Sequence, residues 1–429
     1  MNPTLAVISG FLGAGKTTLS TNLISYLWEK DMNAALVTND QSSGLVDSEI
    51  ASAGGVNVKE ISGGCFCCRC DEFALALDEI VALRESDIII AEAVGSCTDL
   101  VATVVEPLRV DLQKPYRVLP VVVVVDPDRA EVVLMEPGSA VPAVGDRSEG
   151  DSRSGGIPAA VHETRSGNLL AVDGSFDQAL RAVGTAAGMP VLLGSLDSQI
   201  RLHDDVTYIF LKQMEEAQVI LVNKADAVEP TRMARIVSAI EARCPEADVM
   251  GFSAQSTADI ARLWEYLQAT EARHRPIQEI DYARYAKGEA MLGWLNAECR
   301  VSGGVSMDAL SDAIGEAVYR RQVERGVEIA HLKVSVVELV GEGKGTGISV
   351  VQCVSSAAGP IAVRRCATVV PVARVLINLR AQGAAEDLTE DVQAAVASVT
   401  KRLGVKVEVV RLDSFAPGAP NPPYQRRQG

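Results

Sequence analysis

The stretch "LAVISGFLGAGKTTLS", Leu5 to Ser20, decides the fold. Its first part, Leu5–Ser9, predicts a buried strand, and a helix is predicted over Lys16–Glu29 because leucines recur on one face. The segment between them, "GFLGAGKT", fits the pattern G-x-x-x-x-G-K-[ST] of a phosphate-binding loop. A glycine-rich turn with an incidental Gly-Lys pair is the alternative, and the strand and helix on either side argue against it.

Each residue type in this loop has a chemical purpose. Glycines let successive backbone N–H groups surround phosphate oxygens, and the helix N-terminus adds a favourable dipole. Lys16 brings a positive charge near the β- and γ-phosphates, and the Thr17 hydroxyl can ligate Mg²⁺. The residues expected to hold the nucleotide phosphates are Gly10, Gly13, Ala14, Gly15, Lys16, Thr17 and Thr18.

Further strands predict a parallel, doubly wound sheet. Apolar runs alternate with helical patterns through the first 270 residues, which is typical of sheets buried on both faces. In such sheets, ligands bind at the carboxyl ends of the strands. The runs expected as strands are Ala34–Asp40, Asp87–Ala93, Val121–Asp126, Ala217–Asp226 and Asp248–Ala254.

The sequence "LVNKAD", which ends at Asp226, predicts guanine recognition. A carboxylate at this position accepts hydrogen bonds from guanine N1–H and the 2-amino group, and adenine has neither donor. Asn223 is expected to stabilise the loop, and Lys224 to lie over the base. After the next strand, Ser253 and Ala254 are expected near the base, with the Ala254 N–H directed to its oxygen. A strand-end turn is the alternative.

Two acidic positions are candidates for the metal and water of GTP hydrolysis. Glu92 ends a hydrophobic strand and is expected to hold Mg²⁺ directly or through water, while the N–H of Gly95 senses the γ-phosphate. Asp40 ends another strand and is a candidate for ordering the attacking water or the metal. Either carboxylate could instead be a solvated strand end.

Four cysteines are crowded into six positions of "ISGGCFCCRC". Thiolates are soft ligands suited to Zn²⁺ and Co²⁺. In an extended loop Cys65 and Cys67 point the same way, and a turn after them would bring in Cys68. A redox-active or merely reactive thiol patch is the alternative, since adjacent cysteines are easily oxidised.

With these motifs, the chain resembles the CobW-like family of P-loop GTPases, relatives of the hydrogenase and urease nickel-insertion GTPases. The shared elements are the phosphate loop, "GCFCC", "EAVG" and the Asn-Lys-x-Asp sequence. The segment "TNDQSSGLVD" resembles the family's switch region, with Asp40 in its Glu position and Asp47 in its later Asp position. Gln213 also fits the family pattern. The resemblance covers about residues 3–270.

The resemblance implies GTP hydrolysis coupled to delivery of a transition metal, with Zn²⁺ and Co²⁺ as the usual cargo and Mg²⁺ beside the nucleotide. It carries over Cys65, Cys67 and Cys68 as ligands. Because this cluster lies between the nucleotide-sensing segments, a changed γ-phosphate contact would reshape it. Cys70 is a further candidate ligand, and Cys97 is an extra thiol near the Glu–Gly switch.

The leading hypothesis is a cytoplasmic GTPase that loads a metal, or a cofactor such as cobalamin, into a client protein. GTPases of this type often need a homodimer or the client to complete the site. One alternative is a G-protein chaperone that gates a corrinoid-dependent enzyme without carrying free metal. The other is a metal buffer or sensor regulated by nucleotide.

Composition excludes some other classes. The net charge of −16 argues against a nucleic-acid partner, since such proteins carry a basic face. No apolar run approaches the roughly 20 residues that span a bilayer, so no membrane association is expected. The N-terminus lacks the basic region of a signal peptide, and nine cysteines with an adjacent pair do not suggest a disulfide framework.

Pattern changes divide the chain into parts. A P-loop GTPase domain is expected over residues 1–270, with a flexible Gly-, Ser- and Pro-rich insertion at 136–167. A linker follows at 271–280. Residues 281–415 predict a smaller α+β domain with a mixed sheet and a role in client recognition. The proline-rich tail, 416–429, is expected to be disordered.

Overall fold

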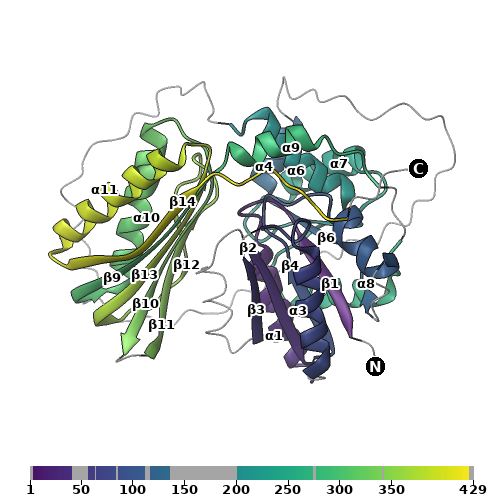
Figure 1. Ribbon diagram of the computed structural model, residues 1–429, viewed down its shortest axis with the longest axis horizontal. Coiled ribbons are helices and arrows are strands. Elements are labelled where there is room, and N and C mark those ends of the chain that lie inside the picture. Colours follow the sequence, from purple (N-terminus) through teal and green to yellow (C-terminus); the bar gives the residue numbers. More distant parts are fainter. Residues whose placement is uncertain are drawn as a thin grey trace. The chain divides into compact units, whose positions relative to one another are not determined.

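The phosphate loop follows the first strand of a parallel β-sheet (Figure 1). The computed structural model describes residues 3–40, 57–62, 64–83, 86–111, 116–135, 201–273, 277–340 and 343–424. The predicted insertion at 136–167 and Asp47 lie outside these residues. The strands are β1 (Thr4–Ser9), β2 (Ala34–Asp40), β3 (Asn57–Ser62), β4 (Ile88–Glu92), β5 (Arg117–Val118), β6 (Val122–Val125), β7 (Val219–Val222) and β8 (Asp248–Gly251).

The strand order is β3-β2-β4-β1-β6-β7-β8, with β5 beside β1, and every pairing is parallel. From β1 the chain builds outward first on one side and then on the other. The carboxyl end of β1 is therefore the switch point at which open α/β sheets bind ligands. Pairing in register aligns Ile8, Glu92 and Thr38 in one row, so the loops that follow them begin at the same edge.

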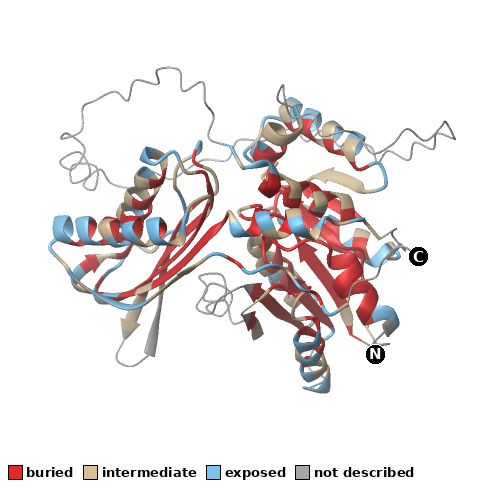
Figure 2. Cartoon of the chain, turned by 45° about the horizontal axis from the view of Figure 1, so that its top comes forward, coloured by how far each residue is buried: buried red, intermediate tan, exposed pale blue. Residues whose placement is uncertain are grey.

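Helices cover both faces of this sheet. They are α1 (Lys16–Trp28), α3 (Cys70–Leu83), α4 (Pro127–Met135), α6 (Asp204–Glu216), α7 (Pro230–Arg243) and α8 (Thr257–Ala269), with π-helical turns η1 (Val101–Val105) and η2 (Pro107–Asp111). Leu5 belongs to a core shared with α3, α6 and α7, whereas Ile8 joins the core formed with α1 and α8. The central strands β1, β4, β6 and β7 are buried almost throughout (Figure 2), which explains why their sequences are apolar, whereas β3 and β8, at the two ends of the strand order, are largely half-buried.

The second sheet is antiparallel. Its order is β12-β11-β10-β13-β9-β14, formed by β9 (Gly293–Ser306), β10 (Ile329–Val340), β11 (Gly343–Cys353), β12 (Ile361–Arg364), β13 (Val369–Ala381) and β14 (Lys406–Phe415). Helices α10 (Met307–Glu324) and α11 (Ala385–Leu403) lie side by side on one face (Figure 1). The predicted α+β class is confirmed.

The expectation of a mixed sheet is wrong. Helix α10 connects β9 to β10, which is the kind of connection that would allow a parallel pair. However, β13 inserts between these strands and runs antiparallel to both. The short link between β10 and β11 also permits only antiparallel pairing.

Helix α9 (Tyr282–Ala290) begins within the part predicted as the second domain, yet it packs on the first. Tyr285 is fully buried in the same core as Phe210 of α6. Thus the segment before β9 supports the region around β4 and α6. Among the described helices, none has both the length and the apolar character needed to cross a bilayer.

Candidate nucleotide and thiol sites

The phosphate loop has the backbone conformation that anion binding requires. Gly13 and Gly15 have φ values of 77° and 100°, in the left-handed region that glycine adopts without strain. Helix α1 starts at Lys16 with no side-chain cap, so its first N–H groups are available to phosphate oxygens. A Cβ at Gly15 would lie 2.2 Å from Asn223 Nδ2, so this position needs glycine for space as well.

Lys16 is held over the loop that it serves. Its Nζ donates to the carbonyl oxygens of Gly10 at 2.8 Å and Phe11 at 3.2 Å. The side chain is buried, with 8% exposure. The ammonium group is thus directed at the loop interior, where the β- and γ-phosphates of a nucleotide would lie.

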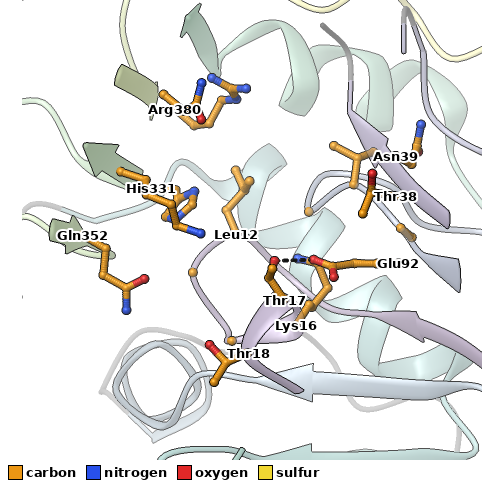
Figure 3. Close-up of a pocket in the computed structure, with 17 residues that line it drawn as sticks. Leu12, Lys16, Thr17, Thr18, Thr38, Asn39, Glu92, His331, Gln352 and Arg380 are labelled. Atoms are coloured by element: carbon orange, nitrogen blue, oxygen red, sulfur yellow. Dashed lines mark hydrogen bonds between the residues drawn. The ribbon is translucent and has the colours of Figure 1, made fainter. Parts of the chain in front are cut away.

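Glu92 reaches the first turn of α1. The Thr17 hydroxyl donates to its Oε1 at 2.6 Å (Figure 3). The Ser20 hydroxyl donates to its Oε2 at 2.9 Å. Oxygen donors of this kind suit Mg²⁺, which takes a few carboxylate or hydroxyl ligands together with phosphates and water. The predicted pair Thr17 and Glu92 therefore fits a magnesium ion, while sequence patterns did not single out Ser20.

Asn223 connects the base-binding region to the phosphate loop. Its Nδ2 donates to the Ala14 carbonyl at 2.8 Å, and its Oδ1 accepts from the Ala254 N–H at 2.9 Å. The latter bond differs from the expectation that the Ala254 N–H faces the base. Ser253 is buried beside it, and its N–H donates to Asp259.

Lys224 and Asp226 lie at the open end of the same loop. Lys224 has a positive φ of 61°, and its Nζ is 2.5 Å from Asp126 Oδ2 at the end of β6. Asp226 is exposed. Its role in guanine recognition stays a prediction.

A pocket opens in front of the phosphate loop, and the antiparallel sheet contributes to it (Figure 3). Lys16, Thr17, Glu92 and Gly95 line one wall. The residues from the other sheet are His331, Lys333, Gln352, Asn378 and Arg380. Sequence patterns did not connect these residues with the nucleotide, because they come from strands more than 300 positions along the chain.

The sulfurs of Cys65, Cys67 and Cys68 converge. The Sγ of Cys65 lies 2.6 Å from that of Cys67 and 3.3 Å from that of Cys68, and Cys67 and Cys68 are 3.8 Å apart. Cys65 and Cys67 are buried, whereas Cys68 is half-buried. A hydrogen-bonded turn, in which the Cys68 N–H donates to the Cys65 carbonyl, brings them together as the sequence predicted. The three thiols form a ligand set suited to a soft metal ion.

Asn39 fixes the loop that carries this cysteine cluster. Its Nδ2 donates to the Gly64 carbonyl at 2.7 Å and to that of Ile61 at 3.1 Å, and its Oδ1 accepts from the Phe66 N–H at 2.8 Å. Asn39 stands near the end of β2, directly before Asp40, whose side chain lies outside the described set. The sequence prediction singled out Asp40 and missed the positioning role of Asn39.

Cys70 and Cys97 are placed differently. Cys70 is the first residue of α3, and burial, followed by the charge of Asp71, raises the pKa of its thiol to about 12. Among the described cysteines, it is not part of the converging group. Cys97 is fully buried on the loop after β4, with its Sγ 3.6 Å from that of Cys67. Burial opposes ionisation of Cys97, but hydrogen bonding with Cys65 and Cys67 lowers its pKa to about 6.

Buried acids surround the loop after β4. Burial, followed by the charge of Asp99, raises the pKa of Glu216 to about 8. Burial also raises the pKa of Asp99 to about 6 and that of Glu289 to about 8. Because Tyr285 accepts a hydrogen bond from the Thr98 N–H, and Tyr282 donates to Asp99, α9 holds this loop against α6.

The C-terminal tail reaches the cysteine cluster. The Asn421 N–H donates to Cys68 Sγ at 3.2 Å, and the Tyr424 hydroxyl donates to Asp71 at 2.9 Å. Residues 416–424 are thus placed without helix or strand, where composition alone predicted disorder. Residues 425–429 lie outside the described part.

Fold and site together define a P-loop nucleotide-binding protein with a thiol cluster at the same sheet edge. The model of the "CobW/HypB/UreG, nucleotide-binding domain" family matches residues 4–250, more than half of the 429 residues. The chain therefore belongs to the CobW/HypB/UreG family of P-loop GTPases. The predicted recognition and fold class are confirmed.

Individual relatives match over shorter stretches. Zinc chaperone YjiA of Escherichia coli (strain K12) is 31% identical over 103 residues, which cover 23% of this chain and 32% of the relative. Zinc chaperone YeiR of the same organism is 39% identical over 64 residues, which cover 14% and 19%. The match thus spans about a third or less of the length of these curated relatives.

Solved structures of two relatives are similar at low identity. HypB from Helicobacter pylori in complex with nickel covers 64% of this chain and 92% of its own, at 15% identity and a TM-score of 0.36. Zn(II)-bound YjiA GTPase from E. coli covers 93% and 99%, at 13% identity and a TM-score of 0.34.

Proposed function

We propose that this protein is a GTP-hydrolysing metallochaperone that binds Zn²⁺ or Co²⁺ at Cys65, Cys67 and Cys68 and delivers it to a client metalloprotein in the cytoplasm. The observation that carries the proposal is the convergence of these three sulfurs at the sheet edge that bears the phosphate loop. The family membership and the zinc chaperones among the relatives support a metal cargo. A cobalamin-type cofactor is a second form that the cargo could take.

The nucleotide half of the function uses the residues around the phosphate loop. Lys16 and the N–H groups at the start of α1 hold the β- and γ-phosphates, and Thr17 with Glu92 holds Mg²⁺. The exposed carboxylate of Asp226 selects guanine. In this proposal the N–H of Gly95 senses the γ-phosphate, and Asp40 orders the attacking water.

Coupling between the two sites follows from shared strands. Asn39 connects the end of β2 to the cysteine loop, and β2 pairs with β4, which ends in Glu92. Loss of the γ-phosphate and a shift of the magnesium ion would change the contacts of Glu92 and of the loop after it. The same strand ends carry the cysteine loop, so its geometry and its affinity for metal would change with the nucleotide.

The test compares metal affinity in two nucleotide states. Under reducing conditions, Zn²⁺ and Co²⁺ affinities of the full chain are measured by chelator competition, with GDP and with a non-hydrolysable GTP analogue, alongside GTP turnover. We expect one ion per chain, an affinity that differs between the nucleotides, and measurable turnover. Replacing Cys65, Cys67 and Cys68 by Ser should abolish stoichiometric binding and leave GDP affinity unchanged.

A matched control and two other outcomes make this test decisive. Cys366→Ser changes a half-buried cysteine outside the cluster and should leave metal binding intact. Absence of stoichiometric metal on the wild type would overturn the metal-cargo proposal and favour a chaperone that gates a corrinoid-dependent enzyme. Metal affinity that is indifferent to nucleotide, with negligible turnover, would favour a buffer or sensor.

A further inference from the structure

Three thiolates leave a tetrahedral site one donor short. Structural zinc sites in proteins are almost always four-coordinate, and a fourth side chain completes the coordination. Cys65, Cys67 and Cys68 all come from one turn, so they occupy one side of a bound ion. The fourth donor must therefore come from another segment that faces this turn.

Cys97 faces the turn from the loop after β4. Its Sγ lies 3.6 Å from Cys67 Sγ, and its thiol also interacts with that of Cys65. In a tetrahedron with zinc–sulfur bonds of about 2.3 Å, neighbouring sulfurs are about 3.8 Å apart. The sulfur separation between Cys67 and Cys97 falls close to this value, as does the separation between Cys67 and Cys68. Cys97 is fully buried, so its sulfur is not exposed to water.

The other neighbours of the cysteine cluster are less well placed than Cys97 to be the fourth metal ligand. Neither Cys70 nor Cys97 belongs to the group of three described sulfurs that lie within 4.8 Å of one another. Cys97 Sγ contacts that group at 3.6 Å from Cys67 Sγ, whereas Cys70 lies in the first turn of α3. Asn421 contacts Cys68 through its backbone N–H, which is a hydrogen-bond donor and not a metal ligand. Cys97 is thus a thiol from another segment of the chain that already contacts the cluster.

We propose that Cys97 is the fourth thiolate ligand, and that it makes metal binding respond to the nucleotide. This inference rests on the proposed metal-binding function. Cys97 follows Gly95 by two residues and Glu92 by five. The sulfur is therefore carried by the segment that would contact Mg²⁺ and the γ-phosphate, while the other three sulfurs are carried by the loop anchored to Asn39.

Hydrogen bonds connect the residues of the short turn from Val94 to Cys97. The Cys97 N–H donates to the Val94 carbonyl at 3.0 Å. From α6, Gln213 Nε2 donates to the carbonyl oxygens of Gly95 at 2.9 Å and Cys97 at 2.8 Å. A displacement of Gly95 on γ-phosphate contact is therefore transmitted to Cys97. The result is a metal site that alternates between four sulfurs and three.

The first experiment counts sulfur ligands without any substitution. X-ray absorption at the zinc edge is recorded for the full chain loaded with one Zn²⁺, with GDP and with a non-hydrolysable GTP analogue. We expect four sulfurs at about 2.3 Å in one nucleotide state. Three sulfurs with a nitrogen or oxygen donor in both states would overturn the inference and leave the proposed function standing.

The second experiment compares two buried cysteines of the same region. Cys97→Ser should weaken Zn²⁺ binding by at least about 10-fold and remove the difference between GDP and the GTP analogue. In the Co²⁺-loaded protein, it should lower the sulfur-to-metal charge-transfer absorbance per ion by about a quarter, as one of four thiolates is lost. Cys70→Ser, the matched control, should change neither quantity. GDP affinity of both variants reports correct folding.

The outcomes separate the two levels of the proposal. If Cys97→Ser and Cys70→Ser both behave like the wild type, Cys97 is not a ligand, although the three-thiolate chaperone remains. If the wild type binds no stoichiometric Zn²⁺, the proposed function and this inference both fail. A Cys97→Ser variant that loses affinity equally in both nucleotide states would overturn the switching role.

Discussion

The phosphate loop and the cysteine cluster lie at the same edge of the parallel sheet, but different parts of the chain build them. The phosphate loop is contiguous: residues 10–18 supply the backbone groups, and glycines at left-handed φ set their directions. The cysteine cluster depends on side chains from separate strands, because Asn39 of β2 fixes the turn of Cys65 and the loop after β4 brings in Cys97. The phosphate loop is thus built from residues adjacent in the sequence, and the cysteine cluster from segments that the fold brings together.

This difference has consequences for how each site responds to change. A loop defined by its own backbone conformation keeps its shape when neighbouring segments move. A cluster whose members are carried on two strand ends changes its geometry when either end moves. We therefore expect the phosphate loop to act as the fixed element and the cysteine cluster as the responsive one. The predictions below test this contrast, beginning with the largest effect.

Lys16→Ala should lower GTP affinity by about 10²- to 10³-fold, because it removes charge-assisted hydrogen bonds to the phosphates. In the absence of nucleotide, Zn²⁺ affinity should be unchanged, since Lys16 Nζ donates to the carbonyl oxygens of Gly10 and Phe11, which belong to the phosphate loop and not to the cysteine turn. Calorimetric titration with GTP and chelator competition with Zn²⁺ measure the two quantities. Lys30→Ala, an exposed lysine after α1, is the control. A parallel loss of zinc affinity would show that the two sites are not separable.

Asp226→Asn should lower GTP affinity by about 10²-fold, because one carboxylate oxygen becomes an N–H₂ group that faces the guanine donors. Xanthine carries an oxygen where guanine has the 2-amino group, so XTP affinity should rise. Titration of both nucleotides against both proteins gives a crossed comparison that serves as its own control. Equal weakening of GTP and XTP would contradict a base-reading role for Asp226.

The features that could be predicted from the sequence are those built from contiguous motifs, and the features that were missed depend on the tertiary fold. The parallel sheet, the phosphate loop and the Thr17–Glu92 pairing were readable because strand-end motifs meet at one edge of a doubly wound sheet. Asn39 was missed because an asparagine in a strand has no distinctive spacing, and its role exists only once β2 and the cysteine loop are adjacent. The sheet order of the second part was also missed, since β13 inserts between β9 and β10 from far along the chain.

Asn39→Ala should weaken Zn²⁺ binding by about 10-fold, in the range seen when a residue that orients metal ligands is lost. The variant removes three hydrogen bonds to the cysteine loop, including those to Gly64 and Phe66. Chelator competition measures the effect, and thermal unfolding checks the fold. The control is Asn33→Ala at the opposite end of the strand, where the side chain is exposed. Unchanged zinc affinity would mean that the cysteine turn holds its own shape, as the phosphate loop does.

The smallest expected effect comes from the C-terminal tail, which adds a third segment to the cysteine cluster. Truncation after Phe415 removes the N–H that Asn421 donates to Cys68 Sγ and the bond from Tyr424 to Asp71. Since each such bond stabilises by about 1 kcal/mol or less, Zn²⁺ release to a competing chelator should accelerate by about 2- to 5-fold. GTP affinity should be unchanged. Truncation after Tyr424 retains both contacts and is the matched control. Equal Zn²⁺ release rates from the two truncated proteins would limit the responsive site to the strand-end loops. Faster release from the protein truncated after Phe415 alone would show that the tail is part of this site.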